Sequence, residues 1–450
     1  MKQFWKTGFA LLVLVGLGLY VWKYEWGQEV GPDEPKETVL AVEKDAVIGV
    51  TIEAGEGETL RLEKQDGTWR LAAPFEAPAD GTAVDSILDR LEKLEADEIV
   101  LETADDVAQY GFEPAGRRVT VSLEGEDAPR VVEFGGTAPG GSAVYARVPS
   151  SPRIYTVDSS VETSFDKKPF DLRDRDLLHA KRGDVRTIEV DGPEGTYSLA
   201  RTDAGEWAFT RPLATRAGRW KVDGLLGTLE NLRMESVAEE EAGSLKPYGL
   251  DAPVRSVRLV LADGSTRTLE IGAPAGEEDE GKHHAREKGS SLVAVVPGAI
   301  VTDLEKGMAE LRANKLLEVA TYDTEGFDVV SEGVTKTFAK STVEDEDGFD
   351  KAQWTRTAPD EADLETTTVE DALFKMGGVE VQAFVDEPSD LAGHGLEAPL
   401  VRVTVRATAE SWFELGRKGD EYFARRSADD AVLRLDPAKA AELIEALEAL

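Results

Sequence analysis

One cassette of residues, which occurs three times along the chain, places the strongest constraint on the fold. Each copy begins with a tryptophan, has a proline five residues later, and has a valine ten residues after the proline. The three sets are Trp69, Pro74 and Val84; Trp207, Pro212 and Val222; and Trp354, Pro359 and Val369. The copies recur with a period of about 140 residues. That period is far above the ~20–50 residues of solenoid repeats, so each copy can bury a core of its own.

A second landmark lies about 26 residues after each valine. It is an aromatic residue followed by glycine, an apolar residue, an acid and then proline. The three copies are Tyr110-Gly111-Phe112-Glu113-Pro114, Tyr248-Gly249-Leu250-Asp251-Ala252-Pro253 and His394-Gly395-Leu396-Glu397-Ala398-Pro399. Glycine suits the left-handed residue that ends a helical turn, and proline prevents the helix from continuing. We therefore interpret Gly111, Gly249 and Gly395 as structural markers, like the tryptophans and prolines of the cassette.

The residues around these landmarks alternate in a way that is typical of strands. Ile48, Val50 and Ile52 alternate with polar residues, and Leu60 and Leu62 do the same after a turn, which predicts a hairpin. The segment that begins at each cassette valine has an apolar stripe with helical spacing. We expect four more short strands after each glycine turn, and then a closing helix. In the second copy that helix is predicted over residues 302–319.

These patterns indicate the α+β class, with mostly antiparallel sheets and helices on one face. We expect three tandem repeat domains at residues 39–179, 180–319 and 320–450. A chain of 450 residues has about the length of three domains. Shorter echoes support the repeat: Leu172-Arg173 and Leu311-Arg312, and also Ala146-Arg147, Ala285-Arg286 and Ala424-Arg425.

The N-terminus carries a membrane signal. Residues 1–6 hold two lysines and are expected in the cytoplasm. Residues 7–22 carry no charge and have aromatic residues at their ends. Because no small-x-small cleavage site follows, we predict an uncleaved transmembrane signal-anchor over residues 7–24 rather than a removed signal peptide. Residues 25–38 read as an acidic linker rich in Pro and Gly. The chain is thus expected to be a single-pass protein of the cytoplasmic (inner) membrane, with its bulk in the periplasm or another extracytoplasmic space.

Charge and cysteine content exclude several classes of function. The chain has 51 Lys and Arg against 88 Asp and Glu, a formal net charge of −37. Such a negative field repels phosphate backbones, so we expect no nucleic-acid partner. There is no cysteine, which excludes disulfides, thiolate metal sites and cysteine nucleophiles.

The candidate metal ligands lie in one acidic segment of the second copy. Glu278, Glu280, His283 and His284 combine carboxylates with imidazoles, as a divalent cation requires. However, adjacent histidines on a strand point to opposite faces, and the first copy has no ligands in the same place. We therefore favour a solvated hairpin and predict no metal site. The acidic run from Glu344 to Asp350 likewise lacks the ligand spacing of a calcium loop and is interpreted as a hairpin tip.

We identify no catalytic residues and no cofactor site. His394 occupies the place of a turn tyrosine, and none of the four histidines is accompanied by a patterned Ser or Asp. Since the shared residues mark a shared fold, separate functions are expected where the copies differ. Those places are His394, the Glu344 to Asp350 run, the acidic hairpin of the second copy and the charged joins between domains, such as Lys167, Lys168, Arg173 and Arg175.

The cassette resembles the bacterial family catalogued as domain of unknown function 4340. The motifs that carry the resemblance are Gly67-x-Trp69-x-Leu71-x-x-Pro74, Gly205-x-Trp207-x-Phe209-x-x-Pro212 and Tyr248-Gly249-Leu250 with Pro253. The third copy departs from them with Arg356 and His394. The resemblance implies one N-terminal span, repeated α+β units and the genomic company of ABC-type, gliding-motility-type export systems. It supplies no catalytic residues.

Three functions remain open from the sequence. The first is a non-enzymatic, membrane-anchored extracytoplasmic accessory subunit that partners the permease or auxiliary membrane subunits of an ABC-type envelope transport system. The second is an envelope scaffold or adhesin that binds polysaccharide or another surface protein and would need an exposed aromatic groove. The third is a hydrolase that uses carboxylates, which would need two convergent acids with perturbed pKa values.

Overall fold

The computed structural model describes residues 36–55, 57, 59–104, 106–203, 205–276, 279–318, 321–344, 349–386 and 390–450. The chain divides into two compact units, Met1–Arg175 and Asp176–Leu450. Within the described ranges, no helix is long and apolar enough to cross a membrane. The predicted anchor at residues 7–24 lies outside the described residues.

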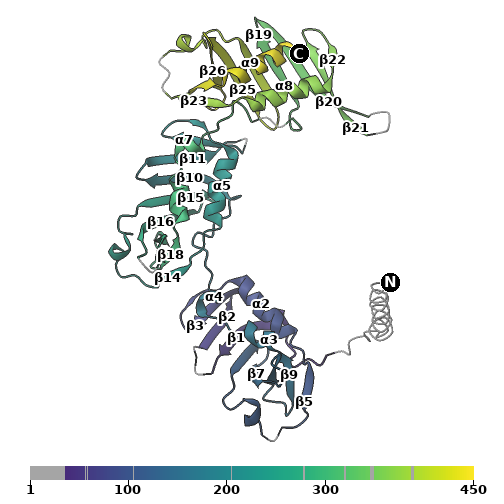
Figure 1. Ribbon diagram of the computed structural model, residues 1–450, viewed down its shortest axis with the longest axis vertical. Coiled ribbons are helices and arrows are strands. Elements are labelled where there is room, and N and C mark those ends of the chain that lie inside the picture. Colours follow the sequence, from purple (N-terminus) through teal and green to yellow (C-terminus); the bar gives the residue numbers. More distant parts are fainter. Residues whose placement is uncertain are drawn as a thin grey trace, which may run out of the picture. The chain divides into compact units, whose positions relative to one another are not determined.

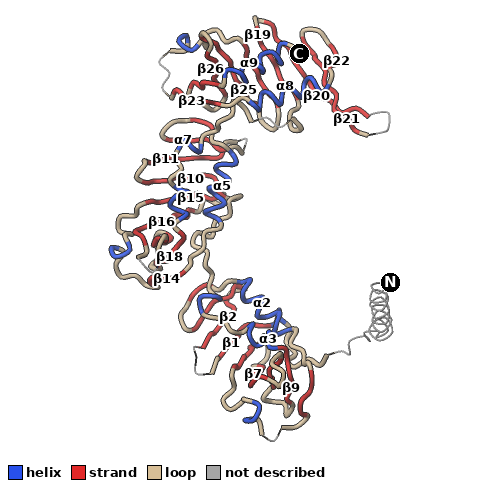
Figure 2. The backbone as a smooth tube through the Cα atoms, viewed as in Figure 1, coloured by secondary structure: helices blue, strands red, loops and turns tan. Residues whose placement is uncertain are grey.

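Three nine-stranded sheets make up most of the molecule, one in the first unit and two in the second (Figures 1 and 2). The first runs in the order β4-β3-β2-β1-β6-β7-β8-β9-β5, and the other two repeat that order with their own strands. The paired neighbours are antiparallel, as in β1 with β2 and β1 with β6. The predicted combination of mostly antiparallel sheets with a few helices is therefore confirmed.

The strands of the first sheet are β1 (Val47–Glu53), β2 (Thr59–Gln65), β3 (Thr68–Ala73), β4 (Ala77–Pro78), β5 (Glu98–Leu101), β6 (Arg117–Leu123), β7 (Arg130–Thr137), β8 (Ala143–Arg147) and β9 (Ile154–Asp158). Those of the second are β10 (Val185–Gly192), β11 (Gly195–Arg201), β12 (Trp207–Arg211), β13 (Thr215–Arg216), β14 (Ser236–Glu239), β15 (Arg255–Leu261), β16 (Thr266–Pro274), β17 (Lys282–Glu287) and β18 (Val293–Pro297). Those of the third are β19 (Gly326–Ser331), β20 (Val334–Glu344), β21 (Asp350–Ala358), β22 (Ala362–Leu364), β23 (Val381–Val385), β24 (Val401–Arg406), β25 (Glu410–Lys418), β26 (Glu421–Arg426) and β27 (Val432–Leu435).

The helices occupy corresponding places in the three repeats. They are α2 (Gly81–Glu92), α3 (Ser159–Ser164), α4 (Pro169–Leu172), α5 (Arg219–Glu230), α6 (Ala299–Leu304), α7 (Met308–Leu311), α8 (Thr366–Gly378) and α9 (Pro437–Glu448), with short 3-10 turns at Lys44–Ala46, Ala108–Tyr110, Lys246–Tyr248 and Ala392–His394. In the third repeat α8 and α9 lie side by side over the sheet (Figure 1).

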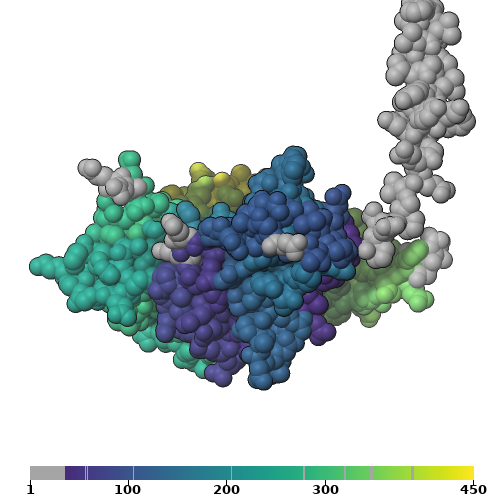
Figure 3. Space-filling view, turned by 90° about the horizontal axis from the view of Figure 1, so that it is seen from below, coloured from purple at the N-terminus to yellow at the C-terminus, as the bar shows by residue number. Residues whose placement is uncertain are grey.

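The first helix of each repeat shows why the sequence folds as it does. In α2 the residues Val84, Ile87, Leu88 and Leu91 are buried, in the spacing of one helical face. The Asp80 carboxylate accepts hydrogen bonds from two backbone N–H groups of the first turn and caps the helix. The buried face packs into a single core with the strands of the first sheet. In the space-filling view the early (purple) and later (blue) residues of this unit form one continuous surface (Figure 3).

The closing helix predicted over residues 302–319 is wrong in detail. The structure has two short helices there, α6 and α7, and extended chain follows. The break falls at Gly307, which has an extended backbone (ψ −168°) and caps α7. Glycine breaks a helix easily because it gives up the most backbone freedom when it is held in one. In the extended chain after α7, Arg312 forms an isolated antiparallel β-bridge with Ala217.

The cassette tryptophans occupy equivalent strand positions, as the repeat predicts. Trp69, Trp207 and Trp354 pair with Lys64, Arg201 and Lys340 on the neighbouring strand. In each repeat the same strand pair has a register shift a few residues further on, and the peptide bond before the cassette proline is cis. Trp207 and Trp354 are buried, whereas Trp69 is only partly buried. The equivalence is thus confirmed, and full burial holds for two of the three.

The difference in burial gives a test of the repeat. Replacing Trp354 by Ala should cost about 3–5 kcal/mol of unfolding free energy, because it opens a cavity in a closed core. The same change at the partly exposed Trp69 should cost clearly less. Denaturant unfolding of each variant, read locally by hydrogen exchange in β20 and in β2, measures both costs. Equal costs at the two sites would contradict the burial difference.

Candidate functional site

The aromatic residue of each glycine turn packs against a ring on a strand of the same repeat. Tyr110 meets Tyr145 at 5.0 Å between ring centroids and an interplanar angle of 81°. In the second repeat Tyr248 meets His284 at 5.0 Å and 79°. In the third, His394 meets Phe423 at 4.9 Å and 78°. The same edge-to-face pair therefore occurs three times, and two of the four histidines serve as its rings.

The glycine of each turn has the left-handed backbone that the sequence predicts, with φ of 78° at Gly111 and 67° at both Gly249 and Gly395. A side chain at any of the three would also collide with the backbone of the adjacent strand. Both facts explain why the turn requires glycine. The turn markers are thus structural.

The candidate metal ligands do not converge. His283 and His284 lie next to each other on β17, where successive side chains point to opposite faces. The ring Nδ1 of His283 lies 3.2 Å from the carbonyl oxygen of Gly272. Glu280 lies in the preceding turn, and Glu278 is outside the described residues. In the part of the chain that the structure describes, no three His, Asp or Glu side chains gather where they could hold a metal ion.

The second acidic run connects two strands, as expected for a hairpin. Glu344 ends β20 and Asp350 begins β21. The residues between Glu344 and Phe349 are outside the described ranges.

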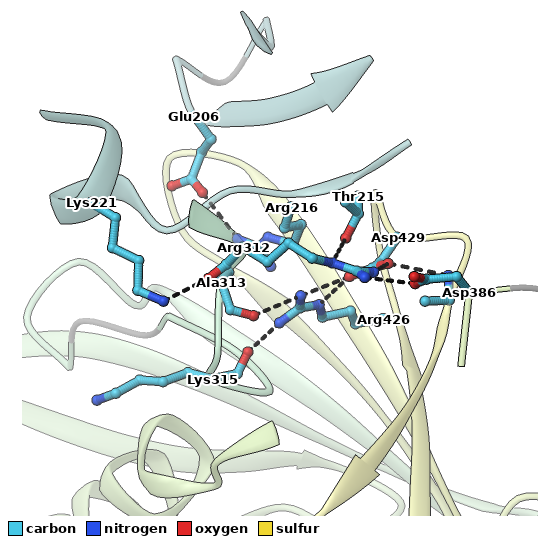
Figure 4. Close-up of polar contacts among 11 residues, drawn as sticks. Glu206, Thr215, Arg216, Lys221, Arg312, Ala313, Lys315, Asp386, Arg426 and Asp429 are labelled. Carbon is cyan, nitrogen blue, oxygen red and sulfur yellow. Dashed lines mark hydrogen bonds and ion pairs between the residues drawn. The ribbon is translucent and has the colours of Figure 1, made fainter. Parts of the chain in front are cut away.

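The residues that the fold does bring together lie where the second sheet meets the third, within the second unit (Figure 4). Arg312, in the extended chain after α7, is almost fully buried, with a side chain 3% exposed. Its guanidinium donates to Thr215 Oγ1 at 3.1 Å and to the Asp386 carboxylate at 2.6 Å. It also lies 3.8 Å from the ring centroid of Phe384. A third-repeat aspartate, Asp429, is 3.6 Å from its second terminal nitrogen.

Asp429 is shared by a second buried arginine. The Arg426 guanidinium donates to its carboxylate from Nε at 3.0 Å and from Nη2 at 2.7 Å. Arg426 also donates to the carbonyl oxygens of Ala313, at 3.0 Å, and of Lys315. Burial lowers the pKa of Arg426, and the Asp429 carboxylate opposes that shift. We call Arg312, Asp386, Arg426 and Asp429 the junction cluster.

Backbone contacts support the junction cluster. The Asp430 N–H donates to the carbonyl oxygen of Ala214 at 3.1 Å, so the third repeat is hydrogen-bonded to the second through main chain as well. Lys221, in the first turn of α5, donates to the carbonyl oxygen of Arg312 at 2.9 Å. The side chains and the main chain thus fix the second and third sheets as one body.

Sequence reasoning found only part of this cluster. The Leu311-Arg312 echo of Leu172-Arg173 marked the position of the first arginine, and in its own unit Arg173 stacks 5.3 Å from the ring of Phe75. Arg426 and Asp429 gave no repeat signal, because the first and second copies have other residues there. Only their difference from the other copies could have indicated them.

A groove of about 780 Å³ lies beside the junction cluster. Its walls come from both repeats, and it is lined by the start of α5, by residues of 314–318 and 322–324, and by the connection from β24 to β25. Two large aromatic side chains line it and still face solvent: Trp220 is 77% exposed and Tyr322 is 80% exposed. A groove of this size suits ligand binding.

Four carboxylates line the groove: Glu206, Glu318, Asp323 and Glu410. Glu206 is engaged by Arg216 at 3.0 Å. The carboxyl groups in the described ranges whose pKa departs from its usual value all shift downward, as at Asp303, where a hydrogen bond from Lys306 lowers it. None of these shifted groups lines the groove.

His284 provides a pH test of the ring pair. Burial lowers its pKa below the ordinary 6.5, a nearby Asp279 opposes the shift, and its Nδ1 is buried with no hydrogen-bond partner among the described residues. Because the pKa of His284 is lower in the folded chain than in the unfolded chain, the unfolded chain binds the proton at a higher pH. The associated stability is therefore present above about pH 6.5 and is lost as the pH drops through the pKa of the folded state. His284→Tyr and His284→Phe, which copy the other repeats, should remove that part of the pH dependence. Thermal unfolding between pH 7.5 and 5 measures it, and an unchanged profile would contradict the assignment.

The junction cluster provides a second test. Asp429→Asn leaves two buried guanidinium groups without their shared charge, and breaking a buried pair in this way should cost about 3–5 kcal/mol. The exposed pair of Lys439 and Glu442, at 2.8 Å, is the matched control, and Glu442→Gln should leave unfolding unchanged. Hydrogen exchange of residues 312–316 and 426–431 under increasing denaturant reports the cost. A variant as stable as the control would show that the cluster does not hold the junction.

Comparison with known proteins gives a family but no characterised relative. No curated protein matches the chain. Among solved structures, the crystal structure of the DNA polymerase III subunit beta from Pseudomonas aeruginosa covers 88% of this chain and 94% of its own, with 8% sequence identity and a TM-score of 0.14, and a likeness that low carries no argument. The model of the family described as "Domain of unknown function (DUF4340)" matches residues 69–215 and 207–399, so that the two matches begin at the first two cassette tryptophans, and the chain belongs to this family.

Proposed function

We propose that the protein is a non-enzymatic, membrane-anchored extracytoplasmic accessory subunit that works with an ABC-type envelope transport system. In this proposal residues 7–24 hold the chain in the cytoplasmic membrane and the three sheets lie outside it. The repeats present binding surfaces to the permease or to auxiliary membrane subunits. The genomic company that the family resemblance implies is what directs the proposal to transport.

The observation that carries the non-enzymatic part is the use made of the buried charges. In the second unit the buried Arg426 is hydrogen-bonded to Asp429 and to main-chain carbonyls, and the buried Arg312 lies 3.6 Å from Asp429. They join two repeats and are not available to a substrate. A subunit whose buried charges fix the geometry of a surface is suited to holding a partner, because a preorganised surface loses little entropy on binding.

A second candidate function, an envelope scaffold or adhesin, is favoured by one observation. It requires an exposed aromatic groove, and Trp220 and Tyr322 line such a groove. The two functions are compatible, since an accessory subunit can also hold an envelope component. The hydrolase alternative lacks a comparable observation among the described residues.

Affinity purification of the full-length chain from native membranes in mild detergent tests the transport role. We expect ABC-type permease or ATPase subunits to co-purify at a level well above that found with an unrelated single-span protein carrying the same tag. A second sample, in which residues 7–24 are exchanged for the span of that unrelated protein, separates contacts within the membrane from contacts outside it. If transporter subunits are no more abundant with this chain than with the unrelated protein, the transport role is wrong.

A further inference from the structure

We propose that the groove between the second and third sheets binds a neutral polysaccharide chain, with Trp220 and Tyr322 stacked on its sugar rings. The proposal deepens the scaffold or adhesin candidate, on which it rests, and it stands or falls separately from the transport role. It is argued from the placement of the aromatic side chains and the local balance of charge.

The two aromatic side chains of the groove come from different repeats. Trp220 belongs to the first turn of α5 in the second repeat, and Tyr322 precedes β19 in the third. Of the four exposed aromatic side chains among the described residues, these two line the groove, whereas Phe349 and Phe374 do not. Exposed aromatic side chains that share one groove indicate a binding site.

Hydrogen bonds hold both parts of the chain that carry these aromatic side chains. The start of α5 is tied to the chain after α7, because Gly218 N–H donates to the Leu311 carbonyl at 2.8 Å. The carbonyl of Tyr322 accepts a hydrogen bond from Lys340 Nζ at 3.0 Å. In the junction cluster beside the groove, Arg312 of one repeat meets Asp429 of the other. A ligand therefore meets aromatic residues on chain that is already held in place, which favours affinity.

The charge of the groove differs from that of the whole chain. Its lining includes four basic residues, Arg216, Arg219, Lys221 and Lys315, and four acidic residues, Glu206, Glu318, Asp323 and Glu410. The groove is thus balanced in a protein with a formal net charge of −37. A balanced lining does not select an ion, whereas the surrounding negative field repels an anionic chain. Both effects favour a neutral ligand.

A neutral sugar chain matches the remaining chemistry. One face of a pyranose ring carries C–H bonds with partial positive hydrogens, which are attracted to the negative face of an aromatic ring. Its edges carry hydroxyl groups that both donate and accept hydrogen bonds. Arg219, Asn314 and Glu410 supply the planar donors and acceptors to meet them. An open groove also admits a chain that continues beyond it at both ends.

A protein segment fits the groove less well. The centre of a protein interface is depleted in charged residues and loses its water. Here eight charged side chains line the walls, and the two aromatics stand 77% and 80% exposed. The groove therefore lacks the continuous apolar floor that a protein anchor would fill.

The test uses the purified full-length chain in detergent and neutral hexasaccharides of glucose, mannose, galactose and N-acetylglucosamine. Titration calorimetry and tryptophan fluorescence should detect binding of at least one of them. Trp220→Ala and Tyr322→Ala should each weaken it at least tenfold. Phe349→Ala is the matched control, since Phe349 is an exposed aromatic (70%) immediately before β21 that does not line the groove, and it should leave affinity unchanged.

Other outcomes overturn the proposal. If none of the neutral hexasaccharides binds, or if binding survives both Trp220→Ala and Tyr322→Ala, the groove is not a glycan site. Tighter binding of hexagalacturonate than of the galactose hexasaccharide would show that the site selects an anion. A photocrosslinker at position 220 that captures a protein in cells, together with no hexasaccharide binding, would assign the groove to a protein partner. Unchanged hydrogen exchange in β10 to β18 shows that the variants are folded.

Discussion

Two arginines and one aspartate, buried together where the second sheet meets the third, determine what the second unit can do. Burying each charge costs several kcal/mol, because water is lost around it. The cost is offset only where partners meet the charges. The Asp429 carboxylate and main-chain carbonyls accept the donors of Arg426, whereas Arg312 Nη2 lies 3.6 Å from Asp429 and has no hydrogen bond among the described residues. A hydrophobic contact of the same size would stabilise the junction as well, but it would allow the sheets to slide. Directional hydrogen bonds specify one arrangement, and the groove beside them depends on that arrangement.

The repeats share a core and differ at their contacts. All three repeats contain an edge-to-face ring pair, a left-handed glycine and a register shift before the cassette proline. Each of these features is required for the sheet to pack against the same turn. The ring that meets the turn residue can be Tyr, His or Phe, because only a flat ring of about that size is needed. Residues that join one repeat to the next are under no such common constraint. They vary, and they can acquire roles in assembly or binding.

This division explains what could be predicted from the sequence. Strict spacing from tryptophan to proline and on to valine predicted the repeated sheets and the first helix of each, because local periodicity reports a buried face directly. Gly111 and its equivalents were predicted from turn chemistry for the same reason. By contrast, Arg312 and Asp429 are separated by more than a hundred residues and meet only after two sheets have formed. A pair of this kind leaves no periodic signal in one sequence. The closing helix was predicted too long because the apolar spacing continues through Gly307, whereas the helical backbone is interrupted there.

The positions at which the copies differ fall into two groups, those with a structural role and those at the join between repeats. His394 differs from its tyrosine equivalents, yet it keeps the ring pair with Phe423, so that difference is structural. His284 does the same with Tyr248. At the second join the difference has another consequence, since Arg426 and Asp429 exist only in the third copy and contact the second copy beside the groove that Trp220 and Tyr322 line. Because that groove needs residues from two repeats, no single copy could form it. Duplication of a stable sheet thus supplies a binding surface at the junction without altering either core.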